Sequence, residues 1–165
     1  MSEDNKIDIL NGEHMDIARK FIKKHEGREN KVYKDTEGHL TTGIGYKLPK
    51  DSPLKENEYV SNEFVDNKFE ETFMSAAQGA KRILKGAPIK PEAFAYLTAL
   101  VFQMGTTEIS SWSNTLGALK DGDYMKASNE MLKGRAEGTA SKWSLQTPRR
   151  AFDTASEVAK LSNKE

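Results

Sequence analysis

A long run of apolar residues at helical spacing between residues 61 and 84 constrains the fold more than any other feature of the chain. Apolar side chains that recur every three or four positions predict one amphipathic helix with a single buried face: Phe64, Val65, Phe69, Phe73, Ala77, Ala80, Ile83 and Leu84. Ser61 is placed to cap the first turn of this helix, and the segment KGAPIKP ends it with a glycine and two prolines. A helix of this length is expected to join two lobes of one domain.

Two kinds of segment surround the long helix. Before it, residues 11–26 show helical apolar spacing, and residues 31–48 carry β-branched and aromatic residues around the turn DTEG. After it, four further segments are typical of helices: EAFAYLTALVFQMG, SWSNTLGALK, DYMKASNEMLKG and TPRRAFDTASEVAKL. The predicted fold is therefore α+β and mostly helical, with a small three-stranded β lobe and a helical lobe joined by the long helix.

The chain of 165 residues is expected to form a single domain. Within it we expect a loose tail at residues 1–10, an N-terminal α/β lobe at about 11–72 and a C-terminal helical lobe at about 73–165. The two lobes should enclose a cleft, which is where ligand sites tend to lie.

Composition excludes several classes of function. Lysine and arginine total 25 and aspartate and glutamate total 25, so the formal net charge is zero, which argues against a nucleic-acid-binding protein. The absence of cysteine excludes thiol nucleophiles, disulfides and cysteine-ligated metal sites. No apolar run is long enough for a signal peptide or a membrane helix, so we expect a protein that remains in the cytoplasm where it is made.

The segment HEGRENKVYKDTEGHLTTGIGY, from His25 to Tyr46, holds the strongest candidate site. Hydrolysis of a glycosidic bond uses one carboxylic acid to protonate the leaving oxygen and a second, ionised carboxylate to assist the attack. Glu26, at the end of a packed helix, can hold a proton, while Asp35, in a polar hairpin, stays ionised, and Thr41 can hydrogen-bond a water. Because 25 acidic residues provide many such pairs, spacing alone leaves a solvated loop as the alternative.

Other motifs are weaker. The segment GIG lacks the full glycine pattern of a dinucleotide site, and no serine has the glycines of a nucleophile elbow. His14, His25 and His39 have no zinc-type spacing, so each is expected at the surface or in packing. Trp112 and Trp143 are either core residues or part of a wall on which sugars stack. We expect no metal and no cofactor.

The segment around Glu26 closely resembles the active-site segment of phage-type lysozymes, glycoside hydrolase family 24, and in particular those of the T-even bacteriophages. Eight residues separate Glu26 from Asp35, and five more lead to Thr41 and the following GIG. Two further blocks agree in the same order: VFQMG at 101–105, followed by NTL at 114–116, and KWSLQTPRR at 142–150. Three separate blocks in one order are far more specific than the carboxylate pair alone.

The resemblance implies a lysozyme-like fold and a role for each matching residue. Glu26 would be the general acid, Asp35 would position or activate the water, Thr41 would help to hold that water, and Arg150 would pair with Glu26. The implied substrate-binding residues are Gly45, Lys47, Phe102, Gln103, Asn114, Thr115 and Gln146.

The family also implies a reaction and a biological setting. The expected protein is a monomeric, metal-independent muramidase of the endolysin type, which cleaves the β-1,4 bond between N-acetylmuramic acid and N-acetylglucosamine in bacterial peptidoglycan with inversion. It would bind peptidoglycan and neither nucleic acid nor membrane. It would accumulate in the cytoplasm of a bacterial host, reach the wall once the membrane is permeabilised, and lyse the cell.

Several residues depart from the family pattern. Tyr46 stands where the family has a histidine, Lys47 where it has an apolar residue, and Glu130 where a sugar-contacting asparagine is expected. The zero net charge is also unlike the basic character expected of an enzyme that acts on an anionic wall. Two alternatives therefore stay open: a non-catalytic module that binds peptidoglycan or builds a virion, and a lytic transglycosylase on the same scaffold.

Overall fold

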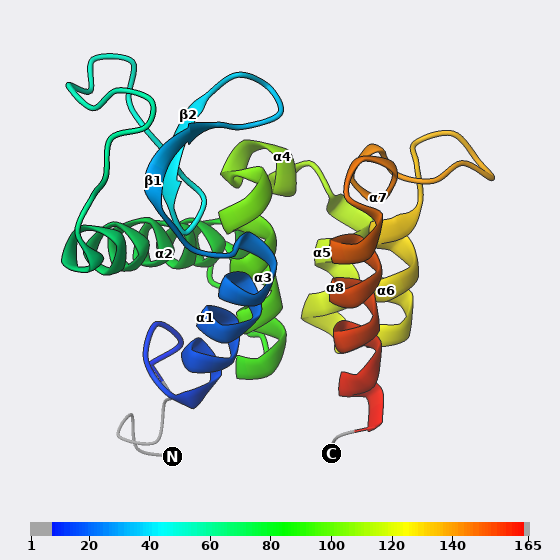
Figure 1. Cartoon of the computed structure of the whole chain (residues 1–165). Coiled ribbons are helices and arrows are strands. Elements are labelled where there is room, and N and C mark those ends of the chain that lie inside the picture. Colours follow the sequence, from blue (N-terminus) through cyan, green and yellow to red (C-terminus); the bar gives the residue numbers. More distant parts are fainter. Residues whose placement is uncertain (1–7, 164–165) are drawn as a thin grey trace.

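The computed structural model describes residues 8–163, and its order of elements confirms the mostly helical α+β class (Figure 1). The N-terminal half contains α1 (Glu13–Glu26), β1 (Glu29–Lys34), β2 (Leu40–Gly43), β3 (Tyr46–Lys47) and α2 (Asn62–Leu84). The C-terminal half contains α3 (Pro91–Met104), α4 (Thr106–Ser110), α5 (Ser113–Asp121), α6 (Tyr124–Leu132), α7 (Lys142–Gln146), α8 (Pro148–Lys160) and the 3-10 turn η2 (Leu161–Asn163).

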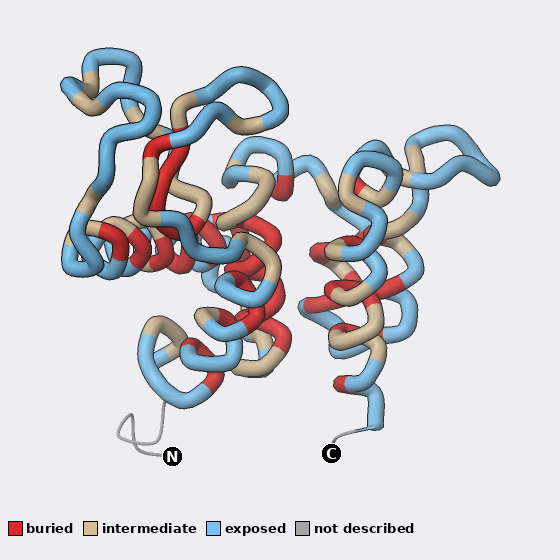
Figure 2. Tube along the Cα trace, viewed as in Figure 1, coloured by how far each residue is buried: buried red, intermediate tan, exposed pale blue. Residues whose placement is uncertain are grey.

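The long helix α2 begins and ends where the sequence predicts. The Ser61 side chain accepts a hydrogen bond of 3.0 Å from the backbone N–H of Phe64, which caps the first turn. Lys85, directly after the helix, adopts a left-handed conformation, and Gly86 and Pro88 follow. The apolar face of α2 is buried against α3, as the buried segments of Figure 2 show.

Helix α3 lies at the centre of the molecule. Residues 93–101 are all buried, so this helix has no solvated face over most of its length. It packs against α1 and α2 on one side and also contacts α8, while α5, α6, α7 and α8 form a second group of helices beside it (Figure 1). Among residues 8–163, no helix combines the length and the apolar character that a membrane span requires.

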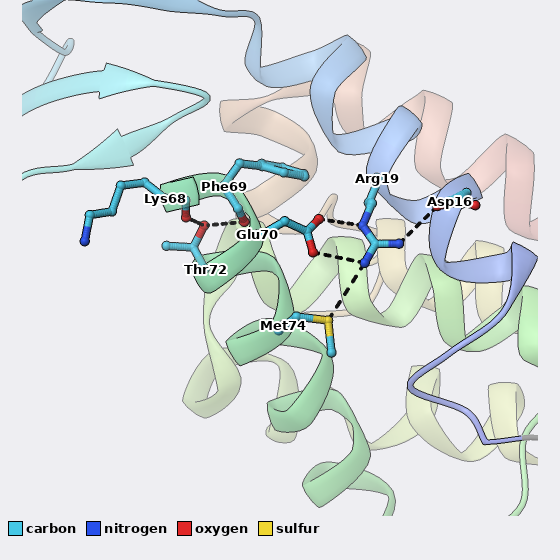
Figure 3. Close-up of polar contacts among 7 residues, drawn as sticks. All are labelled: Asp16, Arg19, Lys68, Phe69, Glu70, Thr72 and Met74. Atoms are coloured by element: carbon cyan, nitrogen blue, oxygen red, sulfur yellow. Dashed lines mark hydrogen bonds and ion pairs between the residues drawn. The ribbon is translucent and has the colours of Figure 1, made fainter. Parts of the chain in front are cut away.

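A polar contact on the outside of the core joins α1 to α2 (Figure 3). Arg19 donates two hydrogen bonds to the carboxylate of Glu70, at 2.7 and 3.1 Å, and a third to Asp16 at 3.0 Å. The same guanidinium lies 4.6 Å from the ring centroid of Phe73, where a cation–π contact adds to the charge pairing. This arginine therefore fixes the helix that carries Glu26 against the long helix.

The sheet is antiparallel, with strand order β1–β2–β3. Thr41 in β2 lies opposite Tyr33 in β1 and opposite Lys47 in β3. The outer edge of β1 is covered by the loop after the sheet, because Val32 exchanges backbone hydrogen bonds of 2.8 Å with Asn57 and Glu58. This pairing protects an edge that would otherwise be open to other chains.

The sequence did not predict the short helices α4 and α7 or the packing of Ile9 and Leu10 against the core. The short helices α4 and α7 each contain five residues, too few for an apolar periodicity to be visible in the sequence. The predicted loose tail falls mainly on residues 1–7, which lie outside the described residues. Directly after these residues, Ile9 and Leu10 pack against the core. The buried His14 ring also donates a hydrogen bond of 2.6 Å to the carbonyl of Ile9.

Candidate active site

Glu26 is the last residue of α1, and its side chain is mostly buried, with 21% exposed. Its Oε2 accepts a hydrogen bond of 2.6 Å from Nη1 of Arg150, in the first turn of α8. The Arg150 side chain is 12% exposed, and its Nη2 is buried without a hydrogen-bond partner among residues 8–163. A charge-assisted bond between two largely buried groups is among the stronger polar contacts, so it joins α1 to α8 at this point.

Gly45 lies directly against this carboxylate. Its backbone is left-handed, with φ of +67°, and a Cβ placed there would overlap Oε1 of Glu26. Only glycine combines that conformation with so close an approach. The turn between β2 and β3 therefore forms one wall around Glu26, and the glycine that the resemblance identified is required by local geometry.

Asp35 follows β1 and starts the turn to β2. Its Oδ1 accepts two backbone hydrogen bonds, from the N–H of Glu37 at 2.9 Å and from the N–H of His39 at 2.8 Å. The hydrogen bond from His39 holds the pKa of Asp35 below its usual range, with further contributions from the Glu37 N–H and the charges of His39 and Lys47. Asp35 is therefore an ionised carboxylate with one fixed oxygen.

Thr41 is buried in β2 and is linked to the same turn. Its hydroxyl donates to the carbonyl of His39 at 3.1 Å, which leaves the lone pairs of the hydroxyl oxygen to accept a hydrogen bond. Tyr33, opposite Thr41, lies near both carboxylates, since burial and then the negative charges of Glu26 and Asp35 raise the pKa of its phenol. The three residues predicted to be catalytic thus gather around β1 and β2.

A second cluster connects α3 to the segment before α8. Nε1 of Trp143 donates to Oε1 of Gln103 at 2.9 Å, and Nε2 of Gln103 donates to the Thr147 hydroxyl at 3.3 Å. The Gln103 side chain therefore uses both of its polar ends within the protein. Trp143 is buried, so the core interpretation of this tryptophan is correct, and its indole N–H is what holds the glutamine in place.

A cavity of about 660 Å³ lies between α5, α6 and the segment around α7. Trp112, Trp143, Asn114, Thr115 and Glu130 line it, but Glu26, Asp35 and Thr41 do not. Asn114 is exposed and its amide lies 3.5 Å from Glu130, which also pairs with Lys133 at 3.2 Å. A second cavity, of about 980 Å³ at the junction of α2 and α3, contains none of the predicted site residues.

The other predicted binding residues differ in their exposure, and Lys47 lies opposite Thr41 and near Asp35. Lys47 is exposed on β3, and Gln146 is exposed at the end of α7. Phe102 is half-buried, and the centroid of its ring lies 5.8 Å from the ring centroid of Phe69. Tyr46, which replaces the family histidine, packs its ring against that of Phe64 in α2, with the two ring centroids 6.2 Å apart. An aromatic contact therefore joins β3 to α2.

Sequence reasoning missed two histidines that contact charged groups. His39 is exposed, as expected, but we did not predict from the sequence that its Nδ1 lies 3.4 Å from Oδ2 of Asp35. His25 donates to Asp153 of α8 at 2.7 Å, beside the contact between Glu26 and Arg150. A histidine four residues after the candidate aspartate was a visible signal for the first contact, whereas nothing in the sequence pairs His25 with Asp153.

Comparison with known proteins agrees with the three sequence blocks. The model of the family described as phage lysozyme matches residues 23–152. A protein of Dictyostelium discoideum, described as probable T4-type lysozyme 2, is 23% identical over an alignment of 154 residues, and the alignment covers 79% of this chain and 86% of that protein. An identity of 23% does not establish particular closeness to the T-even lysozymes. The chain belongs to the phage lysozyme family, and lysozyme activity on peptidoglycan is the function that this membership supports.

Proposed function

We propose that this protein is a muramidase that hydrolyses the β-1,4 bond between N-acetylmuramic acid and N-acetylglucosamine in bacterial peptidoglycan, with inversion. The observation that carries the proposal is the contrast between two carboxylates that both lie near Tyr33. Asp35 is held ionised by two backbone N–H groups, while Glu26 is mostly buried between Arg150 and Gly45. A division between an acid and an ionised carboxylate is what glycoside hydrolysis uses.

The proposed mechanism assigns Glu26 to the leaving group. Glu26 gives its proton to the glycosidic oxygen as the bond to the sugar carbon breaks. The carboxylate that forms is stabilised by Arg150, whose Nη1 already lies 2.6 Å from Oε2. The same contact holds the Glu26 side chain in one position and accepts the negative charge that forms as the proton leaves.

Asp35 and Thr41 act on the water in this proposal. Oδ1 of Asp35 is fixed by the backbone, so Oδ2 is the oxygen left to orient and accept a proton from a water. The Thr41 hydroxyl, which donates to the His39 carbonyl, keeps its acceptor capacity for the same water. Direct attack by that water on the sugar carbon gives inversion, without a covalent intermediate.

The biological setting is part of the proposal. An endolysin of this kind accumulates in the cytoplasm of a bacterial host and reaches the wall once the membrane has been permeabilised, so that it acts as a bacteriolytic protein during host cell lysis. The zero net charge leaves no long-range attraction to an anionic wall, so association should depend on local contacts and only weakly on salt.

Digestion of purified peptidoglycan, with mass spectrometry of the products, tests the proposal. Reducing muropeptides support hydrolysis, and the anomer first formed, followed by NMR, tests inversion. Products lighter by one water, with an anhydro ring, would show a lytic transglycosylase instead. Binding to peptidoglycan without any product would show a binding or virion structural module.

A further inference from the structure

His39 is bound to the two hairpin residues of the proposed mechanism through its backbone and its side chain. Its N–H donates to Oδ1 of Asp35, and its carbonyl accepts from the Asp35 N–H at 2.8 Å and from the Thr41 hydroxyl at 3.1 Å. Its imidazole Nδ1 lies 3.4 Å from Oδ2 of Asp35. The imidazole is therefore next to the one carboxylate oxygen that the backbone leaves free.

We infer that His39 controls the reactivity of Asp35: the imidazolium holds Oδ2 and competes with the water for it, and the neutral imidazole releases it. The inference rests on the proposed function, because it requires Asp35 to orient the water. His39 is a positioning residue in this scheme, since it acts through Asp35 and not on the sugar.

The charges around the imidazole favour this assignment. A histidine side chain ordinarily changes charge between pH 5 and 8. The pKa of Asp35 is held below its usual range, first by the hydrogen bond from the His39 N–H, so the carboxylate stays ionised over that interval. Glu37 on the same turn lies 3.7 Å from Nδ1, and Lys47 of β3 and Tyr33 of β1 also lie near Asp35. Carboxylates, ammonium groups and phenols ordinarily keep their charge state between pH 5 and 8, whereas imidazole is the side-chain type that ordinarily changes it.

The expected effect is modest because the contact is open to water. The His39 side chain is 55% exposed and the Asp35 side chain 21% exposed. Exposed ion pairs shift equilibria by no more than about fivefold. Protonation of His39 should therefore lower kcat about two- to fivefold.

The test measures kcat on purified peptidoglycan from pH 5 to pH 8 for the wild type, His39→Gln and His39→Lys. Glutamine has no titrating charge, so the ratio of its kcat to that of the wild type should rise about two- to fivefold between pH 8 and pH 5. Lysine carries its charge throughout, so its ratio to the wild type should be lowest at pH 8 and approach one at pH 5. Because each variant is compared with the wild type at the same pH, any pH dependence that the three proteins share cancels in the ratio of their kcat values.

Three results would overturn the inference. Ratios that do not vary with pH, in either variant, would show that the histidine only supports the turn. The ¹³Cγ resonance of Asp35 should follow the titration of His39 in the wild type and lose that step in His39→Gln, and a wild-type resonance without the step would contradict the coupling directly. A wild type that releases no product would refute the proposed function and this inference with it, whereas an active wild type with flat ratios contradicts the inference alone.

Discussion

Replacing Gly45 with alanine tests whether the position of the Glu26 carboxylate sets the activity. The φ of +67° costs an L-residue about 1–2 kcal/mol, so the variant should lose roughly that much of its free energy of unfolding. The added Cβ also overlaps Oε1 of Glu26. Relief of that overlap moves the carboxylate or the β2–β3 turn, and a displacement of about 1 Å at a reacting group reduces the rate about 100-fold.

Gly122→Ala is the matched control. Gly122, after α5, also has a left-handed backbone, with φ of +73°, but its two chain neighbours aside, no heavy atom of residues 8–163 lies within 4 Å of its added Cβ. It should lose a similar free energy of unfolding, about 1 kcal/mol, and keep wild-type activity. Urea unfolding gives the stabilities, and initial rates of peptidoglycan digestion give the activities. Wild-type activity in Gly45→Ala would refute the reasoning. An equal loss of activity in Gly45→Ala and Gly122→Ala would refute it as well.

Three further predictions concern contacts between helices. Burial raises the pKa of Asp153, but hydrogen bonds from Lys24 and His25 outweigh it and hold that pKa below its usual range. The resulting stabilisation is present above the unfolded pKa of about 3.9 and is lost as the pH falls through the folded value. Asp153→Asn should therefore be less stable than the wild type by under about 1 kcal/mol at neutral pH, and urea unfolding at pH of about 2 should show no difference. Arg19→Ala removes the contact between α1 and α2 and should cost about 1 kcal/mol in urea unfolding; an unchanged midpoint would contradict the role given to it. Trp143→Phe keeps a buried ring but leaves the glutamine oxygen of α3 without its donor, so it should cost about 1–3 kcal/mol, and a loss as small as a few tenths would show that water replaces the indole.

The long elements were predictable from the sequence because each carries its own signal. The apolar spacing of α2, with Ser61 before it and a glycine after it, fixes both ends of the helix. The polarity of the turn after β1 also placed Asp35 correctly in a hairpin. These signals are local, so they can be read without knowledge of the rest of the chain.

The contacts between distant segments were not predictable in the same way. Glu26 and Arg150 are 124 positions apart, and only the family resemblance linked them. Gln103 stays a predicted sugar contact, and the sequence did not indicate that its side chain also hydrogen-bonds to Trp143 and Thr147. The contact between His39 and Asp35 depends on the exact geometry of a turn, which residue spacing suggests but does not determine.

The measurement that tests the central claim most directly is the rate of peptidoglycan digestion by Glu26→Gln beside the wild type. Glutamine keeps the shape of the side chain and can still accept from Arg150, but it has no proton to give to the glycosidic oxygen. We predict an intact fold by circular dichroism, retained binding to peptidoglycan and no reducing muropeptides above background. Wild-type rates in Glu26→Gln would contradict the assignment of Glu26 as the general acid, and the mechanism with it.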